Sequence, residues 1–148
     1  MIMEKTIYLA GIIDGDGTFR IQKRMIKKWS PKYDCKLRVI NTNRNLMDWL
    51  KNNFGGTYGI QGKIGNGRWK TCYVWELSSK QAINLTEKIV KYLIIKKKRA
   101  ELLLQFKKTL NWGMGNKKRV PEQINIERER IYLEMKKLNQ RGIRELSK

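Results

Sequence analysis

Residues 9–17 read Leu-Ala-Gly-Ile-Ile-Asp-Gly-Asp-Gly and join an apolar segment to two aspartates set among glycines. The segment from Ile7 to Ile13 is apolar on most faces, which predicts a helix buried between two packing partners. Gly15 and Gly17 predict that this helix does not run far beyond Asp14. Asp14 and Asp16 would then stand at the end of the helix, where carboxylate oxygens can hold a hard divalent cation.

The acidic pair has two other interpretations. A calcium-binding EF-hand loop starting at Asp14 requires glycine at its sixth position and glutamate at its twelfth. Those positions hold Phe19 and Met25, which excludes an EF-hand. The remaining alternative is an acidic turn that follows a buried helix and binds no ligand.

Seven of the nine residues in this stretch are identical to the LAGLIDADG motif, and only Ile12 and Gly15 differ from it. Over about residues 5–110, the chain resembles the LAGLIDADG homing endonucleases and their maturase relatives. The resemblance implies an α+β fold with an αββαββα core and a curved antiparallel DNA-binding sheet. One motif in a short chain is the mark of the family's homodimers, whereas single-chain members carry two.

Composition limits the size of the protein and the classes of partner. A chain of 148 residues fits one domain and is too short for two. Its net charge of +20 predicts a polyanionic partner such as nucleic acid, with a basic ribosomal protein as the alternative. The sequence has no histidine, which excludes histidine general bases, HNH-type nuclease sites and Cys/His zinc fingers. No apolar run approaches the length of a membrane span, so we expect no membrane partner.

The order of predicted elements agrees with the core that the resemblance implies. Periodicity predicts strands over 18–29 and 36–41, a helix over 43–54, a hairpin of 58–64 with 68–77, and helices over 79–92, 97–110 and 124–138. Ser30-Pro31 predicts a turn between the first two strands. We expect a single LAGLIDADG endonuclease domain over residues 1–148, with a core at about 5–110 and a C-terminal helical segment at about 120–140.

The resemblance assigns the metal mainly to one aspartate of the pair. It implies that Asp16 binds the metal, which would be Mg²⁺ or another divalent cation such as Mn²⁺. The backbone carbonyl of Gly15 would contribute a further oxygen. Asp14, two residues earlier, would instead cap or stabilise the end of the helix.

Two further catalytic candidates follow from the resemblance. A polar residue at the end of the second strand positions water in the family, and Asn41 matches that place. Thr42 and Asn43 are adjacent alternatives, and a helix N-cap is the structural alternative for Asn41 itself. A lysine before a late core helix stabilises charge in the family, and Lys96 fits best, with Lys98 second. A basic run that only contacts solvent or phosphate is the alternative for these lysines.

A single metal-binding carboxylate per chain is too little to cut two DNA strands. Pairing two motif helices about a twofold axis would bring Asp16 of both chains together, so we predict a homodimer. Gly11 and Gly15 lie four residues apart on one helix face and permit close approach of two backbones. Tyr8 and Ile12 are predicted to join them in the dimer interface.

Basic and amide side chains are concentrated in the predicted strands. Between residues 20 and 38, eight basic residues accompany one acid, Asp34. Strand alternation predicts one sheet face that reads DNA base edges, with lysines on phosphates, whereas a solvated charged face is the alternative. The predicted DNA-binding residues are Arg20, Gln22, Arg24, Lys28, Arg38, Gln61, Lys63, Arg68 and Lys70. Trp69, Tyr73 and Trp75 are predicted to lie in the core.

Together these features predict a sequence-specific, divalent-metal-dependent homing endonuclease, intron-encoded as in the family, that makes a double-strand break in a long pseudo-palindromic DNA site as a homodimer. The alternatives are an RNA-splicing maturase that binds its own intron RNA and a non-catalytic DNA-binding regulator. Two separated cysteines, Cys35 and Cys72, favour a reducing intracellular setting. The abundance of Lys, Ile and Asn suggests AT-rich coding DNA, as in an organelle (chloroplast or mitochondrion) or a microbial cytoplasm.

Overall fold

The structure, a computed structural model, describes residues 2–26, 30–61, 70–110 and 120–140. The turn between the predicted strands 58–64 and 68–77, the residue Trp69 and most of the segment between the predicted helices 97–110 and 124–138 lie outside these ranges. The elements are α1 (Ile2–Asp16), β1 (Gly17–Ile26), β2 (Ser30–Asn41), α2 (Arg44–Phe54), β3 (Thr57–Ile60), β4 (Tyr73–Ser78), α3 (Ser79–Ile89), a 3-10 turn η1 (Val90–Tyr92), α4 (Lys97–Leu110) and α5 (Glu122–Leu138). This order confirms the predicted αββαββα core.

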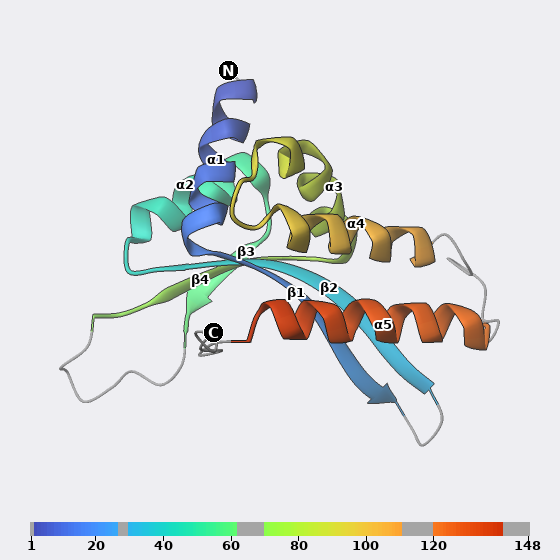
Figure 1. Cartoon of the computed structure of the whole chain (residues 1–148). Coiled ribbons are helices and arrows are strands. Elements are labelled where there is room, and N and C mark those ends of the chain that lie inside the picture. Colours follow the sequence, from blue (N-terminus) through green and yellow to red (C-terminus); the bar gives the residue numbers. More distant parts are fainter. Residues whose placement is uncertain (1, 27–29, 62–69, 111–119, 141–148) are drawn as a thin grey trace, which may run out of the picture.

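The four strands form one antiparallel sheet in the order β1-β2-β4-β3. Helices α1 to α4 gather on one side of the sheet, as Figure 1 shows, and α5 runs beside β1. On the sheet face that the helices cover, side chains of the three adjacent strands β1, β2 and β4 are fully buried. Phe19, Leu37 and Trp75 are examples. The prediction that Trp75 belongs to the core is therefore confirmed, and Tyr73 packs against the same core.

The motif helix α1 buries only one of its two sides. Thr6, Leu9, Ala10 and Ile13 face the core, because positions three and four apart share one helix face. The helix begins earlier than the sequence predicts, at Ile2, and ends at Asp16, not far beyond Asp14, before Gly17 starts β1. A Cβ on Gly17 would lie 2.7 Å from Ile13 Cα, so glycine permits this abrupt change from helix to strand.

The prediction of a turn at Ser30-Pro31 is wrong, because both residues belong to β2. Pro31 pairs with Met25 of β1, whereas β4 pairs only with residues 36–41 of β2. The start of β2 therefore lacks a neighbour on its other side, and a proline without an N–H is tolerated there. In the other hairpin, the described strands are shorter than predicted and end at Ile60 and begin at Tyr73.

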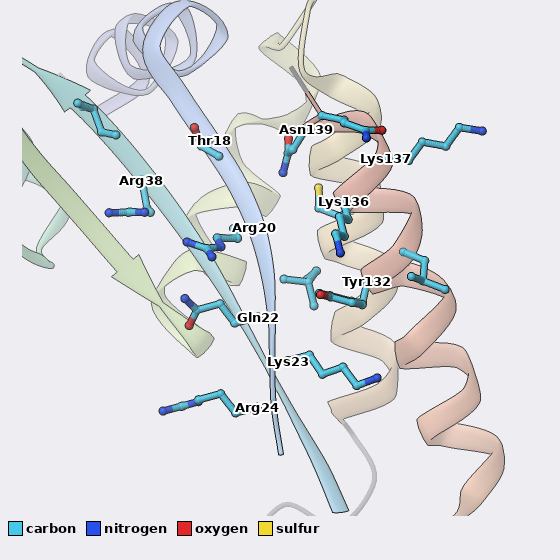
Figure 2. Close-up of a pocket in the computed structure, with 15 residues that line it drawn as sticks. Thr18, Arg20, Gln22, Lys23, Arg24, Arg38, Tyr132, Lys136, Lys137 and Asn139 are labelled. Atoms are coloured by element: carbon cyan, nitrogen blue, oxygen red, sulfur yellow. The ribbon is translucent and has the colours of Figure 1, made fainter. Parts of the chain in front are cut away.

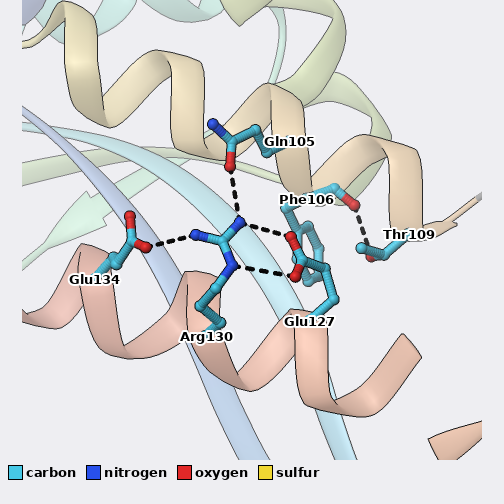
Figure 3. A network of polar contacts seen from close by, with 6 residues as sticks. All are labelled: Gln105, Phe106, Thr109, Glu127, Arg130 and Glu134. Carbon is cyan, nitrogen blue, oxygen red and sulfur yellow. Dashed lines mark hydrogen bonds and ion pairs between the residues drawn. The ribbon is translucent and has the colours of Figure 1, made fainter. Parts of the chain in front are cut away.

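Helix α5 is fastened to α4 by polar contacts as well as by buried Ile131 and Met135. Arg128 donates from Nη2 to the Thr109 carbonyl at 3.0 Å and from Nε to the Thr109 hydroxyl at 3.1 Å. Arg130 binds Gln105 of α4 at 3.0 Å and two glutamates of its own helix (Figure 3). Just after the helix, Asn139 Nδ2 donates to the Phe19 carbonyl at 2.7 Å and holds the last turn of α5 next to β1.

Two smaller predictions concern membranes and cysteines. Among the described helices, none has the length and apolarity to cross a bilayer. Cys35 and Cys72 are free, and no cluster of three potential metal-binding His, Cys, Asp or Glu residues occurs in the described part of the chain. Burial raises the pKa of Cys35 to about 12, so this thiol stays protonated in the core.

Candidate active site and DNA-binding face

Asp14 holds the turn that leads into α4, far along the sequence from the motif. Its carboxylate accepts hydrogen bonds from the backbone N–H groups of Ile94 at 2.8 Å, Ile95 at 3.1 Å and Lys96 at 3.1 Å. The Lys96 carbonyl accepts from Ala100 N at 3.0 Å, so Lys96 is the residue just before α4, and Asp14 satisfies the backbone amides of the turn that leads into that helix. Both oxygens of Asp14 are thereby occupied.

The Lys96 side chain also links the end of α1 to the turn before α4. Its ammonium donates to the Ile13 carbonyl at 3.1 Å and to the Gly17 carbonyl, at the end of α1 where backbone acceptors have no helical partner. Burial is the main cause that lowers the pKa of Lys96, Arg99 acts in the same direction, and Asp14 and Asp16 oppose the shift. The half-buried ammonium therefore lies at the end of the motif helix, on the carbonyls of Ile13 and Gly17.

We expect Asp14→Ala to lower the free energy of unfolding by about 1–2 kcal/mol, because three backbone amides of the turn before α4 lose their acceptor. Urea unfolding followed by circular dichroism measures this loss. Asp16→Ala removes the same charge from the same helix end and is the matched control. An equal loss in both variants would contradict this role of Asp14.

Asp16 is the exposed member of the pair and has an available oxygen. Its Oδ2 accepts a hydrogen bond from Asn41 Nδ2 at 3.0 Å, and no described residue donates to Oδ1. Asn43 N donates to Asn41 Oδ1 at 2.8 Å, which directs the Asn41 amide nitrogen toward Asp16. Asn43 itself is the N-cap of α2 and accepts from Leu46 N at 3.1 Å. Of the two asparagines, Asn41 is thus the one that contacts the motif.

The donor set at this point fits a hard divalent cation only in part. Asp16 and the Gly15 carbonyl could supply oxygen ligands, whereas both Asp14 oxygens already accept backbone hydrogen bonds. Mg²⁺ is commonly held by one or two carboxylates together with substrate phosphates and water, so a single free carboxylate suits it when DNA is bound.

The outer face of the sheet carries the basic side chains that strand alternation predicts. Figure 2 shows Arg20, Gln22 and Arg24 of β1 projecting on the same side as Arg38 of β2. The strand register agrees, since Thr18 pairs with Arg38 and the intervening residues alternate. Gln61 and Lys70 are exposed just beyond β3 and before β4, whereas the predicted contacts Lys28, Lys63 and Arg68 lie outside the described residues.

Two acidic residues on this face moderate its charge. Asp34 binds Arg24 Nη2 at 2.5 Å, and Glu76 of β4 binds both Lys36 and Arg38. The sequence analysis missed Glu76, because only the pairing of β2 with β4 reveals that it lies among these basic residues.

A groove of about 750 Å³ extends the basic face along β1 toward the last turns of α5 (Figure 2). Its charged lining residues are Arg20, Lys23, Arg24, Arg38, Lys136 and Lys137, and no acid of the described chain is among them. The two lysines of α5 were not predicted as site residues. Their only sequence signal is a basic last turn, which also suits an ordinary helix C-terminus.

Comparison with known protein families identifies one family that matches the chain. The sequence pattern described as LAGLIDADG endonuclease matches residues 9–110, which is more than half of the chain. The chain belongs to the LAGLIDADG endonuclease family. Curated protein sequences gave no match.

Solved structures of LAGLIDADG endonucleases confirm the α+β fold. I-CvuI in complex with the I-CreI target is 19% identical, with a TM-score of 0.76 over 97% of this chain and 87% of that one. The archaeal intron-encoded I-Vdi141I complexed with DNA is 18% identical, with a TM-score of 0.75 over 97% and 89%. I-SmaMI bound to uncleaved DNA with calcium is 23% identical, with a TM-score of 0.65 over 95% of this chain but 46% of that one.

The LAGLIDADG helix of this chain leaves its predicted dimer face uncovered. Tyr8 is 59% exposed and meets the Trp49 ring edge-on, with centroids 5.1 Å apart, while Ile12 is half-buried. Gly11 and Gly15 are exposed, and a Cβ added to either would have no neighbour within 4 Å. The fold of one chain therefore gives no steric reason for glycine at these two helical positions.

Proposed function

We propose that this LAGLIDADG protein is a sequence-specific, divalent-metal-dependent DNA endonuclease that works as a homodimer. The observation that carries the proposal is the position of Asp16, an exposed carboxylate with a free oxygen at the end of the motif helix. Family membership supports endonuclease activity, and the neighbours solved with DNA, Mg or Ca support a DNA substrate and a divalent cofactor.

Within each site, the chain's own residues would divide the work. Asp16 and the Gly15 carbonyl would hold the cation, which when bound supplies charge neutralisation and activates water. Asn41, held by the Asn43 amide, would keep the Asp16 carboxylate and nearby water in place. Lys96 would place positive charge near the scissile phosphate. Because the chain has no histidine, proton transfer would pass through ordered solvent.

The glycines of α1 support a homodimer. Glycine inside a helix costs roughly 0.5–1 kcal/mol relative to alanine, and neither Gly11 nor Gly15 is needed for packing within one chain. A second copy of α1 that approaches closely would explain both glycines. The coverage of 46% for I-SmaMI agrees, since this chain corresponds to about half of that longer protein.

Selection from a randomised duplex library tests the proposal. We expect the protein with Mg²⁺ to release cleaved ends that share a pseudo-palindromic sequence, and we expect no product when EDTA removes the metal. Salt-sensitive binding without cleavage would identify a DNA-binding regulator instead. Cleavage at a site with no twofold symmetry would contradict the homodimer.

A further inference from the structure

Glu76 lies among basic residues in the middle of the outer sheet face. Its strand, β4, is flanked by β2 and β3, and Glu76 is directly opposite Arg38 in the β2–β4 pairing. One carboxylate oxygen lies 2.7 Å from Lys36 Nζ and the other lies 3.0 Å from Arg38 Nε. A single acid thus holds two cations of the neighbouring strand.

The contact with Arg38 leaves the useful end of its guanidinium available. Glu76 lies at ion-pair distance from the buried Nε, which donates no hydrogen bond, and the terminal nitrogens of Arg38 have no hydrogen-bond partner among the described residues. Figure 2 shows Arg38 on the same side of the sheet as Arg20 and Gln22. A guanidinium that presents two parallel N–H donors can recognise O6 and N7 of guanine in the major groove.

The Glu76 pair is more enclosed than the other acidic pair on this face. The side chains of Arg38 and Glu76 are 23% and 28% exposed, whereas Arg24, held by Asp34, is 64% exposed. Neighbouring groups therefore restrict the motion of the Arg38 side chain more than that of Arg24. An ordered arginine loses less conformational entropy on binding and discriminates bases better than a freely moving one.

An acid on this face also opposes indiscriminate binding. DNA phosphates attract Lys and Arg regardless of sequence, and a carboxylate between two cations weakens that attraction. The carboxylate lowers the affinity for every duplex. It therefore improves recognition only at a site where a contact with the correct base compensates for the lost attraction.

We propose that Glu76 is a positioning residue that sets sequence specificity by holding Arg38 for one guanine in each half-site and by weakening non-specific phosphate binding. This inference rests on the proposed function, because it requires a DNA duplex on the outer sheet face. It extends that function to a residue outside the motif and outside the cleavage site.

The test compares two variants that change the net charge equally. Glu76→Gln removes the carboxylate from the sheet, and the matched control Glu87→Gln removes one from α3, where Glu87 pairs with Lys107. Each variant and Arg38→Ala pass through the same randomised duplex selection, and each is titrated against a fixed random-sequence duplex at several salt concentrations.

We expect Glu76→Gln to bind the random duplex more tightly and to lose selection at one symmetric pair of guanines, by roughly five- to hundredfold. Arg38→Ala should lose the same pair, and adding Glu76→Gln to Arg38→Ala should have no further effect on selection. Glu87→Gln should match the unaltered protein. Thermal melting of each variant separates these effects from a loss of folding.

Unchanged selection in Glu76→Gln would overturn the inference while leaving the proposed function intact. Loss of a base pair different from the one lost in Arg38→Ala would also overturn it, since Glu76 would then read DNA directly. Failure of the unaltered protein to bind any duplex in a salt-dependent manner would instead contradict the proposed function.

Discussion

Asp16→Asn should reduce DNA cleavage in Mg²⁺ by about 10³-fold or more while DNA binding survives. Asparagine keeps the shape of the side chain and can still accept from Asn41, but it removes the only available motif carboxylate. A metal held beside the reacting phosphate contributes several kcal/mol to the rate, and each 1.36 kcal/mol is about tenfold. Single-turnover cleavage of the selected duplex measures the loss.

The control for this variant is Asp48→Asn, which makes the same charge change in α2, where Asp48 accepts from the Tyr58 hydroxyl. Its cleavage rate should stay close to that of the unaltered protein. Binding measured in EDTA should change by no more than about twofold in Asp16→Asn, as for an ordinary surface substitution. Full cleavage by Asp16→Asn would show that Asp16 is not the metal ligand.

Gly11→Leu should convert the protein to a monomer and abolish double-strand cleavage. The leucine side chain has open space in a single chain but would lie between two closely packed α1 helices. Such overpacking costs roughly 1–3 kcal/mol for each copy, and a twofold interface contains two copies. We therefore expect the dimer dissociation constant to rise at least about thirtyfold, as measured by sedimentation equilibrium.

Gly59→Leu is the corresponding control for assembly, because Gly59 of β3 also has no neighbour within 4 Å of an added Cβ. This variant should keep the dissociation constant of the unaltered protein. At equal monomer concentration, the urea midpoint of the Gly11→Leu monomer should be at least as high as that of the unaltered monomer. The reason is that leucine favours helix more than glycine does. An unchanged dimer in Gly11→Leu would place the interface elsewhere.

The sequence was most informative where function depends on neighbours along the chain. The motif, the end of α1 and the alternation of Arg20, Gln22 and Arg24 follow from local patterns, and the structure has them as predicted. Of the predicted catalytic residues, Asn41 contacts Asp16, and Lys96 binds backbone carbonyls at the end of the same motif helix, although their chemical roles remain predictions.

The missed features depend on contacts between distant segments. The three amides that donate to Asp14 are more than 75 residues away, so no local pattern reveals them. Glu76 joins the basic face only because β4 pairs with β2 instead of lying at the edge. A Ser-Pro pair usually signals a turn. Pro31 is acceptable within β2 because β4 does not pair with this part of the strand.

The C-terminal helix has a consequence for solubility. Strand β1 forms one edge of the sheet, and Asn139, at the end of α5, donates to the Phe19 carbonyl on that strand at 2.7 Å. The opposite edge, β3, has four residues. Exposed strand edges invite strand-to-strand aggregation. Here α5 runs beside the β1 edge and the β3 edge is very short, which limits such aggregation. A protein with many cations and an uncovered helix face can thus associate through helices without sheets joining into larger aggregates.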